Sequence, residues 1–312
     1  MNYLFKTTNQ LTDGEKKCVR DLHYEVFGKV FDPADFEKKY SLTAKGYSYH
    51  GLMIDGSGVV GFYAAVPYRY EFFGKEFIFA LAVDGMIHPE YRKLDPLGYK
   101  KMTSPVYENL RANDIPFIFC FPNDSAYLYT KKVLGWRDIG ALDFYLFPAG
   151  IAAKPADFLA GWLHRAASMF GVSKLRRVVR NAGIKKIADN IFMEHRYGTG
   201  YRTVNLPDGT EFIYRMCREL SRFDVAFIID IRPADGKNIQ GAVSSIIKNE
   251  KNAAAVAYIG KLGSPPPNLI KLPRSLEPKK IRMIGKLLGG ALDDRIFDID
   301  NWEVNLSNFD VR

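Results

Sequence analysis

The chain has 312 residues, of which 47% are hydrophobic and 25% are charged, and these values are ordinary for globular proteins. They exclude wholesale disorder, and the length predicts two domains or one domain with a large addition. No apolar run approaches the roughly 18 residues of a membrane-spanning helix, and the N-terminal segment lacks the apolar core of a secretory signal. Only three scattered cysteines are present, so we expect a reduced, cytoplasmic protein.

The first 150 residues predict one mixed α/β domain. A capping box at Thr12–Glu15 and apolar residues at every fourth position predict a helix that ends at Gly28. Alternating apolar residues and glycine-containing turns predict a run of three strands. The expected strands cover 47–54, 59–72, 75–87, 117–121 and 138–147, and the other expected helices cover 33–40, 96–112 and 125–134.

Residues 151–195 are expected to form a basic helical connector. Between positions 151 and 202 the chain has ten Lys and Arg residues and three Asp and Glu residues, a local charge of +7 within a total of +9. We expect the apolar side of this helix, with Phe158 and Trp162, to pack against protein. Positive charge of this density is usually a solvated face, but it can also attract nucleic acid or another anion.

Residues 196–312 are expected to form a second, divergent α/β domain. Alternation predicts strands over 201–206, 225–231, 254–259, 280–288 and 302–311, and helical patterns cover 210–221 and 239–248. The strand–helix–strand order is that of a mixed sheet. No loop that combines an arginine with glycines lies within it, so we expect this domain to form a wall of a ligand site or a surface for a partner rather than a catalytic centre of its own.

Three familiar kinds of site are excluded by context. Gly56–Gly61 matches the dinucleotide-binding fingerprint in its letters, but it lies in a turn between two expected strands, where no helix begins. The five histidines and the aspartates of 293–300 lack metal-ligand spacing, so no metal site is expected. The basic residues of the connector are not interleaved with a stacking array of aromatic residues, which makes nucleic acid an unfavoured partner.

One arrangement of segments indicates a site for a phosphate-bearing ligand. The expected strand Leu81–Ile87 runs into His88-Pro89-Glu90-Tyr91-Arg92, then into a short loop and a helix. A helix N-terminus of this kind can bind a pyrophosphate, because its free amides and dipole both favour an anion. About thirty residues later come Phe121-Pro122-Asn123 and then Lys131-Lys132-Val133-Leu134-Gly135-Trp136.

In their order and spacing these segments resemble the GNAT superfamily of acyl-CoA-dependent N-acyltransferases. The resemblance covers about Thr12–Phe147 and is closest to GNAT-like proteins that accompany bacterial surface-polysaccharide genes. It implies an α/β fold with a mixed sheet, with two GNAT-like halves in the whole chain. It also implies acetyl-CoA or another acyl-CoA as co-substrate and a small-molecule amine as acceptor, with an amino sugar as the narrower expectation.

The resemblance also implies roles for particular residues. The backbone of Met86 and Ile87 would face the acyl-pantetheine arm, and Asn123 would contact the cofactor. Tyr127 or Tyr129 would protonate the leaving thiolate. The loop that would hold the pyrophosphate contains Arg92, Lys93, Leu94, Leu97, Gly98 and Tyr99.

The residues themselves leave two questions open. Asp84 and Glu90 are both candidates for the carboxylate that takes the proton of the amine. The loop carries a single glycine, whereas the family usually has two small residues. Asp95 adds a negative charge to the loop, and Pro96 lacks the backbone N–H that could bind a phosphate. Two alternatives to an acyl-CoA enzyme therefore remain, a non-catalytic binding protein with a decayed loop and a transferase that uses aminoacyl-tRNA or a carrier-bound acyl group.

Overall fold

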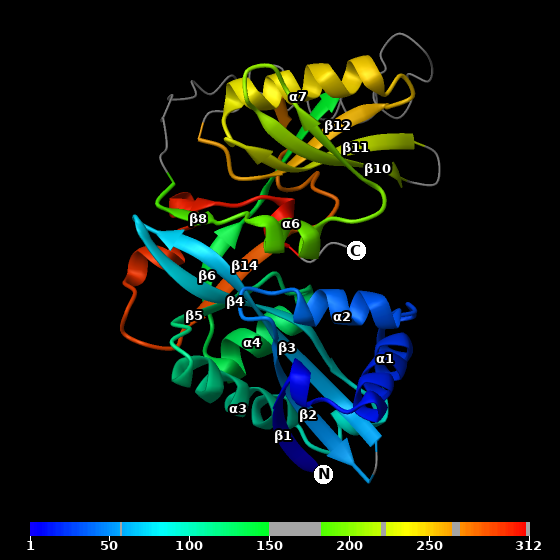
Figure 1. Ribbon diagram of the computed structural model, residues 1–312, viewed down its shortest axis with the longest axis vertical. Coiled ribbons are helices and arrows are strands. Elements are labelled where there is room, and N and C mark those ends of the chain that lie inside the picture. The colour runs from blue at the N-terminus through cyan, green and yellow to red at the C-terminus, as the bar shows by residue number, and fades with distance from the viewer. Residues whose placement is uncertain (57, 150–181, 220–222, 264–268, 310–312) are drawn as a thin grey trace. The chain divides into compact units, whose positions relative to one another are not determined.

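The computed structural model describes residues 1–56, 58–149, 182–219, 223–263 and 269–309, and it divides into two compact units (Figure 1). The first unit contains Met1–Gly140, Gly183–Tyr197 and Arg282–Asp298. The second contains Ala141–Ala182, Gly198–Ile281 and Ile299–Arg312. Each unit therefore includes segments that lie far apart in the sequence.

The first unit is built on a mixed sheet with strand order β1-β2-β3-β4-β5-β14-β6, and β8 pairs with β3 off this path. Strands β1 to β4 are antiparallel, β4 and β5 are parallel, and β14 is antiparallel to β5. The strands are β1 (Asn2–Thr7), β2 (Tyr49–Asp55), β3 (Gly58–Phe72), β4 (Lys75–Ile87), β5 (Phe117–Cys120), β6 (Arg137–Ala141), β8 (Ile184–Lys186) and β14 (Arg282–Leu287).

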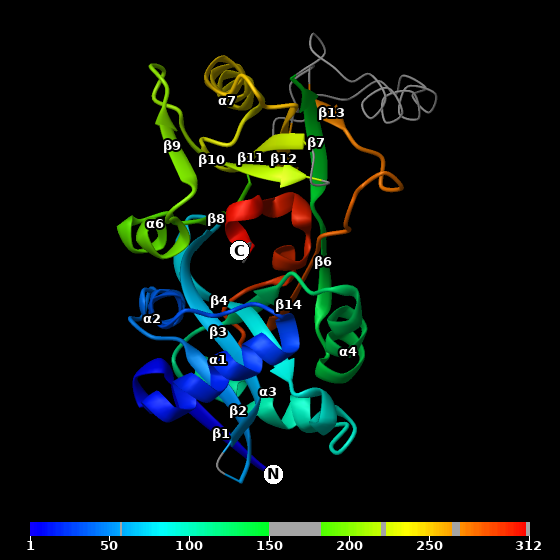
Figure 2. The same ribbon diagram turned by 90° about the vertical axis from the view of Figure 1, so that its right-hand side faces the viewer.

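Helices cover both faces of this sheet (Figure 2). On one face α1 (Asp13–Phe27) and α2 (Pro33–Ser41) pack on a core that includes Phe62 and Met86. On the other face α3 (Gly98–Ala112) and α4 (Asp124–Leu134) pack on a core that includes Tyr63. Neighbouring residues of a strand point to opposite faces, so Phe62 and Tyr63 belong to different cores.

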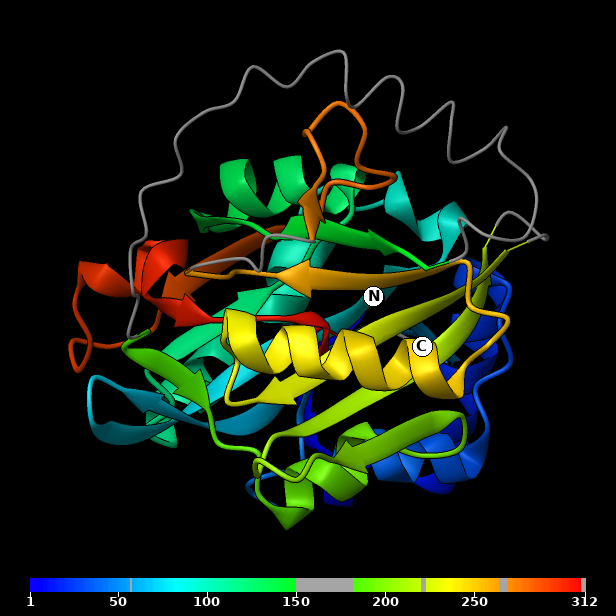
Figure 3. The ribbon, with the colours of Figure 1, turned by 90° about the horizontal axis from the view of Figure 1, so that it is seen from above.

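The second unit has a sheet with strand order β13-β7-β12-β11-β10-β9, and α7 lies across it (Figure 3). The parallel pair β11 and β12 is connected through α7, and the other neighbours are antiparallel. Its elements are β7 (Asp143–Pro148), β9 (Tyr201–Asn205), β10 (Glu211–Glu219), β11 (Phe223–Arg232), α7 (Gly236–Asn249), β12 (Ala255–Gly260), β13 (Ile270–Lys271) and β15 (Trp302–Glu303).

The α/β class with mixed sheets is confirmed, but several expected elements of the second half were wrong. The segment expected as a helix over 210–221 is strand β10, because β9 and β11 pair with it on both sides and its residues Phe212, Ile213 and Tyr214 are buried. The strand expected over 280–288 pairs with β5 in the first unit. The strand expected over 302–311 is limited to β15 and is followed by a short 3₁₀ helix, Leu306–Asn308.

Two boundaries also differ from those expected. The segment expected as one domain over 196–312 is divided between the two units, because Arg282–Asp298 belongs to the first unit. Most of the expected connector, with Phe158 and Trp162, lies outside the described residues. Its described end is not one helix, since β8 is followed by the short helix α6 (Asn190–Arg196). Strand β1, which was not expected, pairs with β2 along its whole length.

Candidate functional site

Strand β4 is bulged and then diverges from β5. Ala64 of β3 pairs with Val83, whereas Phe62 pairs with Met86, so β4 carries one extra residue between these pairs. Its pairing with β5 is limited to Phe79–Leu81, although β4 continues to Ile87. The expected strands 75–87 and 117–121 are therefore neighbours, and they separate after Leu81, beside the bulge.

Asp95 occupies the N-terminus of α3. Its carboxylate accepts hydrogen bonds from the Leu97 amide (3.0 Å), the Tyr3 hydroxyl (2.7 Å) and the Lys101 ammonium (2.7 Å). The bonds from Lys101 and Tyr3 hold the pKa of Asp95 below its usual value. The helix expected over 96–112 begins at Gly98, its N-cap Leu97 provides no side-chain hydrogen bond, and Asp95 binds the helix end from two residues earlier. The negative charge thus lies where the helix end favours an anion.

The loop between β4 and α3 exposes its basic and apolar side chains. Arg92 ends the 3₁₀ helix Pro89–Arg92, and its Nε donates to the Ile87 carbonyl at 2.9 Å. Lys93 is exposed, and Leu94 and Leu97 are 65% and 52% exposed, which is unusual for leucine. Of the six residues expected in this loop, these four are available to a ligand.

Gly98 and Tyr99 are the two loop residues that point inward. A Cβ at Gly98 would lie 3.1 Å from the Tyr3 hydroxyl, so this position is crowded. The Tyr99 hydroxyl lies against Gly85 in the bulge of β4, where an added Cβ would be only 2.1 Å away. Burial raises the pKa of Tyr99 well above its usual value. Tyr99 therefore fills space beside the bulge on the α3 face of the sheet.

Tyr129 lies beside this tyrosine, but Tyr127 does not. The rings of Tyr99 and Tyr129 meet edge to face at 5.6 Å, and the Tyr129 hydroxyl donates to the Pro96 carbonyl at 3.3 Å. Burial raises the pKa of Tyr129. Tyr127 instead donates to Asp138 at 2.8 Å. Two residues apart on a helix point to different sides, and only Tyr129 faces the loop.

Asn123 acts locally as the N-cap of α4. Its side-chain oxygen accepts the Ala126 amide at 2.9 Å, which satisfies one of the helix's free donors. The same oxygen accepts the Ser125 hydroxyl at 3.3 Å. This is a sufficient structural reason for an asparagine after β5.

Asp84 lies in the bulge and is held by α2. The Lys39 ammonium is 2.5 Å from its Oδ2, and the Tyr40 hydroxyl donates to the same oxygen. The side chains of Lys39 and Asp84 are 6% and 11% exposed. Asp84 also has a φ of +50°, a left-handed conformation that is uncommon outside glycine. The sequence singled out Asp84 but not Lys39, because nothing in the spacing of positions 39 and 84 predicts their contact.

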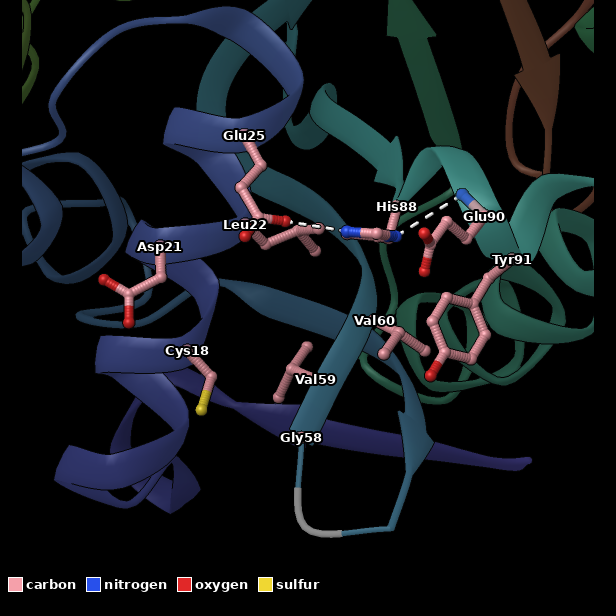
Figure 4. Close-up of a pocket in the computed structure, with 10 residues that line it drawn as sticks. All are labelled: Cys18, Asp21, Leu22, Glu25, Gly58, Val59, Val60, His88, Glu90 and Tyr91. Carbon is pink, nitrogen blue, oxygen red and sulfur yellow. Dashed lines mark hydrogen bonds and ion pairs between the residues drawn. The ribbon is translucent and has the colours of Figure 1, made fainter.

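Glu90, the other candidate base, lies apart from Asp84 in an open pocket of about 350 Å³ (Figure 4). The pocket lies between α1, the start of β3 and the loop after β4. Glu25 and the ring of His88 form an ion-pair contact at 2.9 Å, and the Glu90 amide donates to the other ring nitrogen at 3.4 Å. Asp21 adds a third carboxylate to the lining. The structure thus separates the two candidate carboxylates, one buried and paired and one exposed.

Comparison with known proteins relates the first unit to a family. Residues 7–137 match the family model described as an acetyltransferase (GNAT) domain, so this segment is similar to GNAT domains. No curated protein sequence matches the chain significantly.

Solved structures resemble almost the whole chain in fold. A probable N-acyltransferase from Enterococcus faecalis V583 has a TM-score of 0.62 at 12% identity, over 92% of this chain and 73% of that one. A GCN5-related N-acetyltransferase from Anabaena variabilis has a TM-score of 0.61 at 13% identity with the same coverage. Eis1 from Mycobacterium abscessus has a TM-score of 0.54 at 9% identity, over 91% and 74%. The two mixed sheets correspond to tandem GNAT-like halves.

GNAT domains use an acyl-CoA co-substrate, so the site can be tested for its fit to that group. The divergence of β4 from β5 beside the bulge, the α3 N-terminus and the exposed cations Arg92 and Lys93 all fit a pantetheine arm and a pyrophosphate. Asp95 is the exception, because its carboxylate already binds the α3 end. Among the described residues, no cluster of three metal-ligating side chains is present, and no helix is long and apolar enough to cross a membrane.

Proposed function

We propose that the GNAT-like domain transfers an acyl group from acyl-CoA to a primary amine. The observation that carries this proposal is the bulged β4 strand that leaves β5 and leads directly to the N-terminus of α3. A thioester can lie along the free edge of such a strand, while the helix end binds the phosphates. The similarity of residues 7–137 to GNAT domains supports the same reaction.

In this proposal the chain's own residues orient the co-substrate rather than react with it. The backbone of Met86 and Ile87 lines the pantetheine arm, and an amide of this segment stabilises the developing oxyanion. Arg92 and Lys93 bind the pyrophosphate as exposed cations. The bound acyl-CoA supplies an activated thioester, so positioning of the amine supplies most of the rate enhancement.

We also propose the residues that transfer protons. Asp84 is the carboxylate closest to the separating strands, so we infer that it takes the proton of the attacking amine. Tyr129 is preferred to Tyr127 as the acid for the thiolate, because Tyr127 is bonded to Asp138 and Tyr129 faces the loop. Glu90, with Asp21 and Glu25, offers negative charge to a cationic acceptor at the surface pocket. An aminated small molecule, such as an amino sugar, matches that charge.

A second function, a non-catalytic binding protein, is favoured by Asp95 and Tyr99. Asp95 holds the helix end that a pyrophosphate needs, and the Tyr99 hydroxyl packs against the bulge at Gly85. If both stay in place, the domain keeps the GNAT fold but excludes acyl-CoA. The two functions differ in one measurable property, the affinity for CoA.

Thermal unfolding and calorimetry with CoA and acetyl-CoA test the proposal directly. A ligand at 100 times its Kd adds about 2.7 kcal/mol to the free energy of unfolding, which is readily detected. Release of free thiol from acetyl-CoA is then measured with a panel of amines that includes amino sugars, polyamines and lysine peptides. Binding with amine-dependent thiol release supports the transferase. Absence of binding to either compound rejects it in favour of the binding protein.

A further inference from the structure

The buried contact between Lys39 and Asp84 places a primary amine next to the candidate base. Lys39 and Tyr40 both come from α2, and both reach the Oδ2 atom of Asp84. Buried lysine and aspartate are rare, and removing them from water is costly unless they are paired. At 2.5 Å the Lys39 Nζ is within the distance that a general base needs from the proton it removes.

The backbone at Asp84 shows that this contact is held in place at the strand divergence. Asp84 keeps a left-handed φ of +50° without being glycine, and such conformations persist where the surrounding structure over-determines them. With Gly85 it is one of the two residues that lie opposite Tyr63 in the bulge, immediately before Met86. The amine of Lys39 is therefore fixed beside the segment that the proposed function assigns to the thioester.

We propose that Lys39 is itself an acyl acceptor, so that the domain acylates its own α2 helix. This inference rests on the proposed function, because the acyl group comes from the acyl-CoA bound along β4. A lysine that already contacts the base needs no binding step, which gives it a large advantage over an amine from solution.

The reaction is an ordinary aminolysis of a thioester. Asp84 takes one proton from the Lys39 ammonium, and the lone pair of Nζ attacks the thioester carbonyl carbon. The carbon–sulfur bond then breaks, the leaving thiolate of CoA is protonated by Tyr129, Tyr129 in turn takes up the second proton of nitrogen, and the amide forms at Nζ. The products are acyl-Lys39, free CoA and one proton, which Asp84 passes to solvent.

Acylation would also change the charge of the site. Acyl-Lys39 is neutral, so Asp84 loses its ion pair and keeps the hydrogen bond from Tyr40. Its carboxylate then becomes available to the ammonium group of an external acceptor. Self-acylation is thus expected to precede transfer to an amine from solution.

The experiment is incubation of the full chain with acetyl-CoA, followed by peptide mass spectrometry of lysine acetylation over time. Lys38 is the matched internal control, since it is adjacent on α2 and its Nζ donates to the Tyr197 carbonyl, away from Asp84. We expect acetylation of Lys39 at least tenfold faster than of Lys38, and suppression by excess CoA. Asp84→Asn removes the base and should slow Lys39 acetylation about 100-fold or more, the usual contribution of general-base catalysis. Lys38→Arg should leave the rate unchanged.

The outcomes separate this inference from the proposed function. If acetyl-CoA does not bind in calorimetry, the proposed function fails and self-acylation fails with it. If acetyl-CoA binds or amines from solution are acetylated while Lys39 stays unmodified, or is modified no faster than Lys38, only self-acylation is rejected. If Asp84→Asn unfolds near room temperature, self-acylation is tested instead by the ratio of the acetylation rates of Lys39 and Lys38 in the unaltered protein. Lys39→Arg, which keeps the positive charge, should abolish the labelled peptide in the folded protein.

Discussion

Substitution of Gly85 by alanine tests how tightly the bulge of β4 is packed. An added Cβ would lie 2.1 Å from the Tyr99 hydroxyl oxygen, 3.0 Å from its Cζ and 3.1 Å from its Cε2. Favourable contacts between non-bonded carbon atoms are about 3.5–4.0 Å, so the hydroxyl oxygen and two ring carbons of Tyr99 must move. Overpacking of this kind costs about 1–3 kcal/mol of the free energy of unfolding. We therefore expect Gly85→Ala to lower the melting temperature by about 2–4 °C per kcal/mol.

The second substitution, Tyr99→Phe, identifies the cause. It removes the closest atom and leaves contacts of 3.0 and 3.1 Å, so Gly85→Ala with Tyr99→Phe should recover at least half of the lost stability. Gly58→Ala is the matched control, because the nearest atom to its added Cβ is 3.8 Å away, and its effect should stay within about 0.5 kcal/mol.

Urea unfolding and thermal melts of these variants provide the measurement. The predicted packing is refuted if Gly85→Ala has the same melting temperature as the unaltered protein. It is also refuted if Tyr99→Phe recovers none of the lost stability in the double variant. Either result would mean that Tyr99 does not cover the bulge. The space beside Gly85 would then be open to a pantetheine arm without any movement of α3.

Three further predictions concern the loop and the core. Arg92→Ala should weaken CoA binding by about 1–3 kcal/mol in calorimetry, the usual cost of a lost charge-assisted hydrogen bond, and an unchanged Kd would remove Arg92 from the site. Asp95→Asn keeps an acceptor for the Leu97 amide but removes the negative charge, so CoA affinity should be unchanged or higher, and weaker binding would contradict the assignment of the anion site. Burial lowers the pKa of His50 to about 3, so between about pH 6.5 and 3 the unfolded chain binds a proton that the folded chain does not. The free energy of unfolding should therefore fall by about 1.4 kcal/mol per pH unit from this residue as the pH decreases through that range, and His50→Gln should flatten the slope in urea titrations.

The sequence by itself determined the elements whose signals are local. The capping box at Thr12 and the glycine at position 28 bound α1 as expected, because both act through hydrogen bonds and dihedral angles of neighbouring residues. The strands from Tyr49 to Ile87 followed from alternation and short turns. The order of strand, loop and helix after Leu81 located the candidate site, since a helix N-terminus is specified by the residues around it.

Only the tertiary structure decided which distant segments meet. Local composition favoured a helix over 210–221, but two neighbouring strands supply hydrogen bonds on both edges, so the segment is β10. Strand β14 has an ordinary strand sequence, and nothing in it specifies that its partner is β5 rather than a strand of the second half. Pairing partners are chosen by the packing of whole sheets, which a local pattern does not record.

The same division holds within the candidate site. Asp84, Arg92 and Tyr129 could be selected from the sequence because their residue types and spacing match a chemical task. Their partners could not, because Lys39 lies on another helix and Tyr3 on a strand at the other end of the sequence, and each reaches its carboxylate only after the sheet has formed. An ion pair or hydrogen bond depends on distances of a few ångströms in space, and separation along the chain does not determine them.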